Sequence, residues 1–106
     1  MKIPTGAIIP RAKLLDYLLL PKRKNDKSAF LEQAGFTQSN PEALEAALRR
    51  LIAENEAHSN RVDEYGVFYR VEGKLHGPNG ILAVVTVWIL QKANGEYRFV
   101  TLKPAR

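Results

Sequence analysis

The most constraining feature of this sequence is its last third, Gly73 to Pro104, where strand-like runs alternate with two turn signals. The stretch Gly77-Pro78-Asn79-Gly80 joins a proline of fixed φ to an Asn-Gly pair that tolerates positive φ, and Asn94-Gly95 repeats the second signal. The run from Ile81 to Leu90 is rich in β-branched residues and too short for a surface helix, which is typical of a central strand. We therefore predict three antiparallel strands, at residues 65–75, 81–91 and 97–103.

Strand alternation then assigns the side chains to two faces. A two-residue loop at Asn94-Gly95 would place Leu90 opposite Phe99, and the first turn would place His76 opposite Ile81. One face is apolar enough to be the core: Val67, Tyr69, Val71, Leu75, Leu82, Val84, Thr86, Trp88, Leu90, Tyr97 and Phe99. The other is apolar at its centre and basic at its edges: Phe68, Arg70, Glu72, Lys74, His76, Ala83, Val85, Val87, Ile89, Arg98 and Val100. A bulged first loop would exchange the two faces of the first strand.

The N-terminal half predicts three helices that cover the apolar face and bury Trp88. A helix at residues 10–20 begins at Pro10, and one at residues 26–34 is capped by Asn25 or Asp26 and closed by Gly35. A third, at residues 41–56, is capped by Asn40 and repeats apolar residues at spacings of three and four. On its polar side, Glu45 and Arg49 form a favourable i, i+4 pair.

These elements predict an α+β fold in which N-terminal helices pack on one face of a three-stranded antiparallel meander. A chain of 106 residues is long enough for one domain at residues 1–106. We expect a helical half at 1–56, a mobile linker at 57–64, because that segment has no apolar period, and the meander at 65–104.

Composition removes several functional classes. The chain has no cysteine, which excludes disulfides, thiolate catalysis and cysteine-based zinc sites. No motif for a cofactor or metal is present, and none is expected. No apolar run approaches the roughly 18 residues of a membrane span, and Met1 to Gly6 lacks the apolar core of a signal peptide, so we expect a cytoplasmic protein without membrane contact.

Charge is unevenly distributed along the chain. Residues 1–27 carry a net charge of +5, residues 28–66 carry −4, and residues 67–106 carry +4. The densest basic cluster is Lys22, Arg23, Lys24 and Lys27, and Arg98 adds a cation on the sheet. Such groups can contact RNA phosphates, and contacts of this kind do not depend on the nucleotide sequence. A basic loop is, however, more often only exposed to solvent and without a binding role.

Several motifs together resemble a family of small bacterial proteins of unknown function. They are MKIP at the start, Ile9-Pro10 followed by Leu14 to Leu19, Lys27-Ser28-Ala29-Phe30 leading into Gly35-Phe36, Gly77-Pro78-Asn79-Gly80, and Val85-Thr86-Val87-Trp88-Ile89. The resemblance implies a free-standing small protein, often encoded beside another small uncharacterised gene, and similar domains end large bacterial polymorphic toxins. Toxin and immunity systems include metal-independent ribonucleases with helices on one sheet face and active residues on the other. Relatives often have a histidine just before the Lys-x-x-Phe motif, where this chain has Lys24-Asn25-Asp26.

Two functional hypotheses follow. The first is a metal-independent ribonuclease in which His76 exchanges protons and Arg70 and Lys74 steady the phosphate, since alternation places the three on one face. An exposed histidine near a turn is more often without a role, and Lys74 and Arg70 could simply protect a sheet edge. His58 falls in the predicted linker and is expected to be inert.

The second hypothesis is a non-enzymatic interaction module, either an antitoxin-like protein with a small cognate partner or a homodimer. An apolar stripe would form its interface: Ala83, Val85, Val87 and Ile89. No helix remains to cover this stripe in the predicted fold, and an exposed apolar sheet normally finds a partner.

Overall fold

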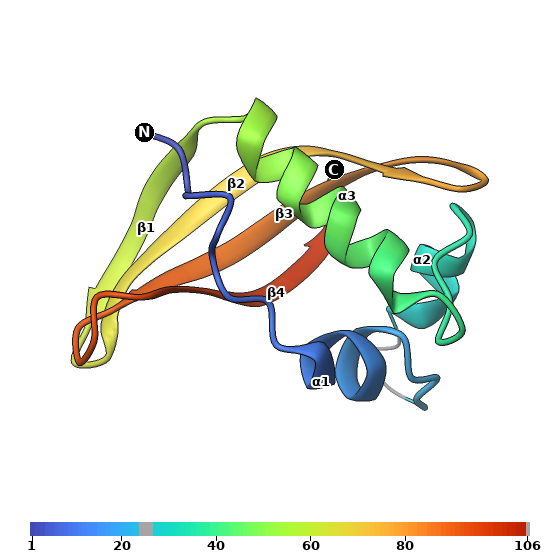
Figure 1. Cartoon of the computed structure of the whole chain (residues 1–106), viewed down its shortest axis with the longest axis horizontal. Helices are drawn as coiled ribbons and strands as arrows, with labels where there is room; N and C mark the ends of the chain where they lie inside the picture. Colours follow the sequence, from blue (N-terminus) through green and yellow to red (C-terminus); the bar gives the residue numbers. More distant parts are fainter. Residues whose placement is uncertain (24–26, 106) are drawn as a thin grey trace.

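Four antiparallel strands and a layer of helices make up the computed structural model, which describes residues 1–23 and 27–105 (Figure 1). The strands follow the chain in spatial order: β1 (Ala57–Asp63), β2 (Gly66–Gly77), β3 (Gly80–Gln91) and β4 (Tyr97–Pro104). Before them come α1 (Arg11–Lys13), the π-helix η1 (Leu14–Leu18), α2 (Ser28–Glu32) and α3 (Pro41–Glu54). None of the helices in the described residues is both long and apolar enough to cross a membrane. The α+β class is confirmed.

The prediction of three strands is wrong, because the expected linker forms the edge strand β1. Only Ala57 of β1 is buried, so this strand has no apolar alternation for a sequence pattern to reveal. A tight turn joins β1 to its partner β2. In this turn, the Asp63 carboxylate accepts hydrogen bonds from the backbone N–H groups of Tyr65 at 2.8 Å and Gly66 at 3.3 Å. Gly66 is required there, because a Cβ would collide with the carbonyl oxygen of Leu90.

The register of the first predicted hairpin is confirmed, and that of the second is wrong. His76 lies opposite Ile81, around a two-residue loop at Pro78-Asn79. After β3, the turn is longer than two residues, so Leu90 pairs with Tyr97 instead of Phe99. Farther along, Trp88 pairs with Phe99, and its neighbour Val87 pairs with Thr101. A bulge between these two pairs shifts the register. Thr101 therefore shares a face with Val87.

The helices differ from the predicted ones in length and position. The helix expected at 10–20 is one turn of α1 continued by η1, in which the Leu19 N–H donates to the Leu14 carbonyl five residues back at 2.8 Å. α2 ends at Glu32, and a left-handed Gly35 (φ 89°) closes the turn after it, as expected. The predicted caps Asn25 and Asp26 lie outside the described residues.

α3 is the longest helix, and it lies in the middle of the chain rather than at its N-terminal end. Asn40 occupies the predicted N-cap position before Pro41. Its side-chain oxygen, however, accepts hydrogen bonds from the Thr37 N–H and hydroxyl, at 2.9 Å each, and makes none to the helix. The ion pair between Glu45 and Arg49 is confirmed at 3.0 Å.

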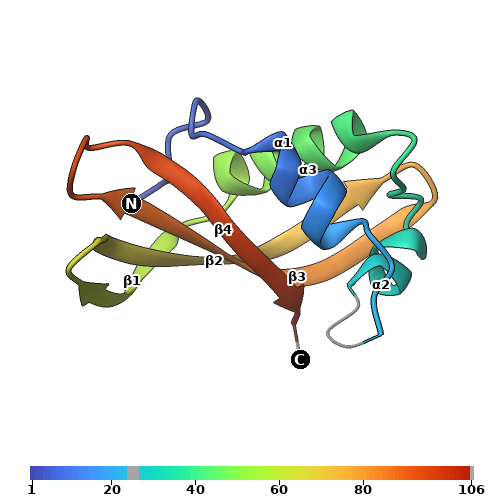
Figure 2. The ribbon, with the colours of Figure 1, turned by 90° about the horizontal axis from the view of Figure 1, so that it is seen from below.

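The core lies between the helices and one face of the sheet. Figure 2 shows α1 and α3 together on one side of the strands. Trp88 is 0% exposed, as predicted, and packs edge-on against Phe99 with ring centres 5.2 Å apart. The remaining core side chains come from both layers: Leu14, Leu18, Leu31, Phe36, Leu44, Leu48, Leu51, Ile52, Val71, Leu75, Val84 and Leu102.

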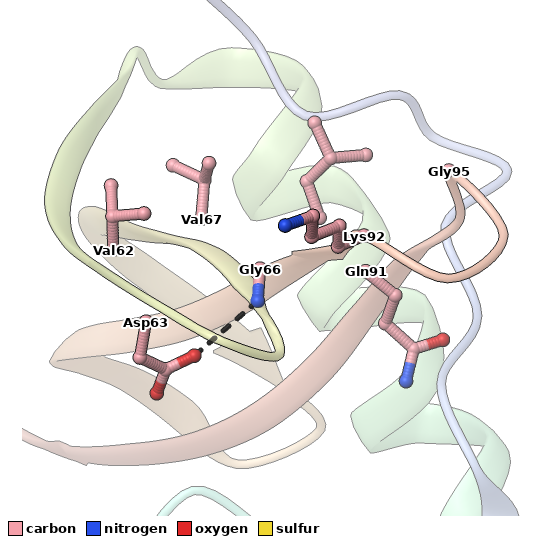
Figure 3. A pocket seen from close by; sticks show the side chains of 8 residues that line it. Val62, Asp63, Gly66, Val67, Gln91, Lys92 and Gly95 are labelled. Atoms are coloured by element: carbon pink, nitrogen blue, oxygen red, sulfur yellow. Dashed lines mark hydrogen bonds between the residues drawn. The ribbon is translucent and has the colours of Figure 1, made fainter.

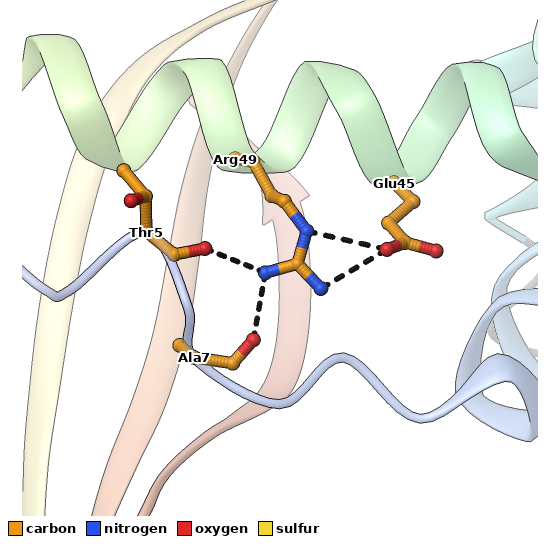
Figure 4. A network of polar contacts seen from close by, with 4 residues as sticks. All are labelled: Thr5, Ala7, Glu45 and Arg49. Atoms are coloured by element: carbon orange, nitrogen blue, oxygen red, sulfur yellow. Dashed lines mark hydrogen bonds and ion pairs between the residues drawn. The ribbon is translucent and has the colours of Figure 1, made fainter.

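The extended segment before α1 is held between α3 and the sheet. The Arg49 guanidinium donates to the backbone carbonyls of Thr5 and Ala7 at 2.7 Å each, and to the Glu45 carboxylate (Figure 4). On the other side, Ile8 pairs in parallel with Arg98, so the segment extends the sheet beyond β4.

Candidate functional site on the outer sheet face

The outer face of the sheet is the one opposite α3, and its side chains form rows that cross the strands. The pairing of β1 to β4 gives the rows in order: Arg61, Phe68, Ile89 and Arg98; His58, Arg70, Val87 and Thr101; Glu72, Val85 and Lys103; Lys74 and Ala83; His76 and Ile81. Charged side chains occupy both sides of an apolar centre, as the alternation predicted for this face.

A polar hollow of about 200 Å³ opens in the middle of this face, lined by Arg70, Glu72, Val85, Lys103 and Pro104. Glu72 on β2 and Lys103 on β4 pair with Val85 from either side, so their backbones are two strand spacings apart, about 10 Å. The Arg70 guanidinium lies 3.9 Å from the Glu72 carboxylate. A carboxylate and two cations therefore surround a space that is large enough for a phosphate group.

His58 lies directly beside this hollow, because β1 places it opposite Arg70. Directly opposed side chains on one face have Cβ atoms about 4.5–5.5 Å apart. Both side chains are exposed, so either can contact a ligand on the sheet. The structure thus groups a histidine that sequence reasoning had assigned to a linker with Arg70, Glu72 and Lys103.

The residues predicted to be catalytic are not all brought together. His76 and Lys74 neighbour each other at the far end of β2, next to the turn at Pro78-Asn79. Arg70 is six residues from His76 along the same strand, which corresponds to about 20 Å. Arg70 is thus far closer to His58 than to His76.

The predicted interface stripe is partly covered by the charged residues around it. Val85 and Ile89 are only 3% and 8% exposed, whereas Ala83 is exposed and Val87 is half-buried. In the row that contains Ile89, the Arg61 guanidinium lies 4.0 Å from the ring centre of Phe68. A guanidinium is attracted to the face of an aromatic ring, and here it covers the Phe68 ring.

A second group of basic residues surrounds Tyr17 on η1, and we call Lys13, Tyr17, Lys22 and Lys27 the lysine–tyrosine cluster. The three ammonium nitrogens lie 5.3, 4.4 and 5.2 Å from the centre of the Tyr17 ring, respectively. The Tyr17 hydroxyl lies 3.1 Å from the Thr101 hydroxyl and accepts a hydrogen bond from Lys27 at 3.3 Å. The hydrogen bond to Thr101, together with Lys27 and Lys13, lowers the pKa of Tyr17 below its usual value, against the opposing effect of burial.

This cluster contains two of the residues predicted to bind nucleic acid, Lys22 and Lys27. Arg23 is exposed beside it, Lys24 lies outside the described residues, and Arg98 is on another row of the outer face. Sequence reasoning missed Lys13 and Tyr17, although their spacing of four residues was a usable signal.

An apolar hollow of about 420 Å³ lies at the other end of the sheet, near the turns that join β1 to β2 and β3 to β4. Its apolar lining comes from Val62, Val67 and Leu90, and Figure 3 shows Asp63 beside it, bonded to the backbone of Gly66. Val62 is 73% exposed. This hollow can hold apolar groups, but its described lining contains no histidine or other group suited to proton transfer near neutral pH.

Among residues 1–23 and 27–105, no three histidine, aspartate or glutamate side chains are grouped closely enough to hold a metal ion. The fold and the outer face together define a small α+β protein with a helix-covered core and a charged open sheet. By sequence, the chain belongs to a family described as a domain of unknown function (DUF6883), whose model matches residues 4–106. No curated protein and no solved structure matches the chain significantly.

Proposed function

We propose that this protein binds single-stranded RNA on the outer sheet face and cleaves it without a metal ion. The observation that carries the proposal is the polar hollow, in which Arg70, Glu72 and Lys103 surround Val85 and His58 lies opposite Arg70. RNA contains its own nucleophile, the 2′-hydroxyl, so the protein has only to move two protons and stabilise the phosphate.

In the proposed reaction, the Glu72 carboxylate accepts the proton of the 2′-hydroxyl while its oxygen attacks the adjacent phosphorus. The bond between phosphorus and the 5′-oxygen breaks, and the His58 imidazolium gives its proton to that oxygen. Arg70 and Lys103 stabilise the additional negative charge on the phosphate oxygens. The products are a 2′,3′-cyclic phosphate and a free 5′-hydroxyl, and no oxidant or cofactor is needed.

Geometry favours His58 over His76 as the acid. His58 is the direct cross-strand neighbour of Arg70, whereas His76 is about 20 Å away along β2. In this proposal, Lys74 extends the cationic surface that holds the RNA strand, and His76, at the end of β2, lies too far away for proton transfer.

The test compares matched histidine variants on an RNA oligonucleotide in the presence of a chelator. His58→Ala and Glu72→Gln should each lower the cleavage rate by roughly a hundredfold to ten-thousandfold, the usual loss for a general acid or base. His76→Ala is the control, and it should retain nearly the full rate. The cyclic phosphate product, identified by mass spectrometry, and the resistance of a 2′-O-methyl substrate should confirm attack by the 2′-hydroxyl.

Three results would contradict the proposal. Equal rates for the wild type and His58→Ala would show that His58 is not the acid. Loss of activity in His76→Ala alone would indicate that the reaction takes place at the far end of β2 instead. If the wild type neither retains RNA at about 50 mM salt nor cleaves it, the nucleic-acid function is rejected.

A further inference from the structure

The lysine–tyrosine cluster brings three lysines together around one tyrosine ring. In the part of the chain that the structure describes, none of the ion pairs joins Lys13, Lys22 or Lys27 to an acidic side chain. All three ammonium groups nevertheless lie within 5.3 Å of one ring centre. Cations are attracted to the face of an aromatic ring, but they repel one another, and a bound anion would relieve this repulsion.

The backbone that carries Tyr17 is itself unusual. Tyr17 belongs to η1, a single π-helical turn inserted after α1, and such turns occur frequently at functional sites. The turn still buries Leu14 and Leu18 in the core, so packing fixes its position. Tyr17 is therefore held on a rigid element, with its hydroxyl at Thr101.

Thr101 connects this cluster to the polar hollow. It belongs to the row of His58, Arg70 and Val87, and lies two strands from Arg70, or about 10 Å. The lysines thus lie just beyond the β4 end of the row that begins with His58. An RNA strand that crosses the sheet along this row would bring a second phosphate to the lysines.

We propose that the lysine–tyrosine cluster is a phosphate subsite that binds a second backbone phosphate of RNA, farther along the strand than the one held at the polar hollow. The inference rests on the proposed RNA-binding function and adds a second contact to it. The ammonium groups supply the charge, and Lys27 and the Tyr17 hydroxyl supply hydrogen-bond donors. Bases are not read at this subsite, so it adds affinity without sequence preference.

The test measures binding of a 2′-O-methyl RNA tetranucleotide to the full chain over a range of salt concentrations. Lys22→Gln combined with Lys27→Gln should weaken binding and lower the slope of log K against log salt by about 0.7, the value for one phosphate contact of a single strand. Lys22→Arg combined with Lys27→Arg keeps the charge and should keep most of the slope. Lys92→Gln, at an exposed lysine in the turn after β3, is the control and should leave the slope unchanged.

A dinucleoside monophosphate, which has a single phosphate, separates this inference from the proposed cleavage. The glutamine double variant should cleave this substrate at the wild-type rate. His58→Ala should cleave it far more slowly than the wild type. An unchanged salt slope in the double variant, or a wild type that does not bind the tetranucleotide, would overturn the subsite. A lower slope without cleavage of any RNA would leave the subsite in place and reject the proposed reaction.

Discussion

The two faces of the sheet differ in how their polar side chains are satisfied. On the helix-covered face, even the polar groups are paired internally: the Trp88 indole N–H donates to the Thr86 hydroxyl, which donates to the Val71 carbonyl, each at 2.8 Å. On the outer face, Arg70, Glu72 and Lys103 surround Val85 and remain accessible to ligands. The helix-covered face therefore holds the main core, and the outer face leaves its charged side chains accessible.

The largest expected contrast comes from removing an apolar side chain on each face. Leu75 is fully buried, so Leu75→Ala should lower the free energy of unfolding by about 2–5 kcal/mol through lost burial and a new cavity. Ile81 is 57% exposed, and Ile81→Ala should stay within about 0.5 kcal/mol of the wild type. Chemical denaturation measures both, and similar losses would show that the outer face is covered in solution.

A matched threonine pair sharpens the same comparison. Thr86→Val keeps the shape but leaves the buried Trp88 N–H without an acceptor, which should cost about 1–3 kcal/mol of unfolding free energy. Thr101→Val removes only a partly buried contact to Tyr17, so about 0.5–1 kcal/mol is expected. Thermal unfolding should rank the two variants in this order. A larger loss for Thr101→Val would mean that the contact at Tyr17 contributes more to stability than the buried pair.

An arginine pair on α3 tests how firmly the N-terminal segment is held. Arg49→Gln removes two hydrogen bonds to carbonyls and one ion pair, and should cost about 1–2 kcal/mol while speeding hydrogen exchange at the Ile8 amide. Arg50→Gln removes only the exposed pair with Glu54, worth about 0.3–0.5 kcal/mol. Unchanged exchange at Ile8 in Arg49→Gln would show that pairing with β4 alone holds the segment.

The smallest expected effect is on the ionisation of Tyr17. Because its folded pKa is lowered, the phenol of Tyr17 should ionise below the usual value of 10.0, and the difference in phenolate absorbance between the wild type and Tyr17→Phe measures this. The resulting stabilisation appears as pH rises through the folded pKa and is complete above the unfolded pKa. Lys27→Gln should move the midpoint upward. A midpoint at or above the usual value would contradict the contacts at the hydroxyl.

Local sequence signals predicted the parts of the fold that depend on neighbouring residues. The Gly77 to Gly80 turn set the register of β2 against β3, and the apolar spacing of α3 located the longest helix. β1 was missed because it is an edge strand with one buried residue, so burial imposes no alternation on it. The bulge beside Thr101 was missed because a register shift within β4 has no signature in amino-acid composition.

In the candidate site too, local sequence signals predicted some neighbours, and those that depend on distant strand pairing were missed. Alternation placed Arg70, Glu72 and Lys74 on one face, but it could not show that His58 lies beside Arg70, since that neighbour depends on β1. The Asp63 to Gly66 turn was the available signal for this strand, because Asp and Gly favour a tight turn. The assignment of His76 as catalytic remains a prediction.

The bridge between Ile8 and Arg98 has a consequence for how the protein is made on the ribosome. Ile8 lies 90 residues before its partner, so the β4 side of the sheet cannot close until β4 has been synthesised. Contacts between such distant positions form late, because closing a long loop costs entropy before the contact stabilises it. Until then, an apolar segment of the nascent chain that contains Ile3, Ala7 and Ile9 stays exposed. A chaperone could bind this segment before it packs into the core.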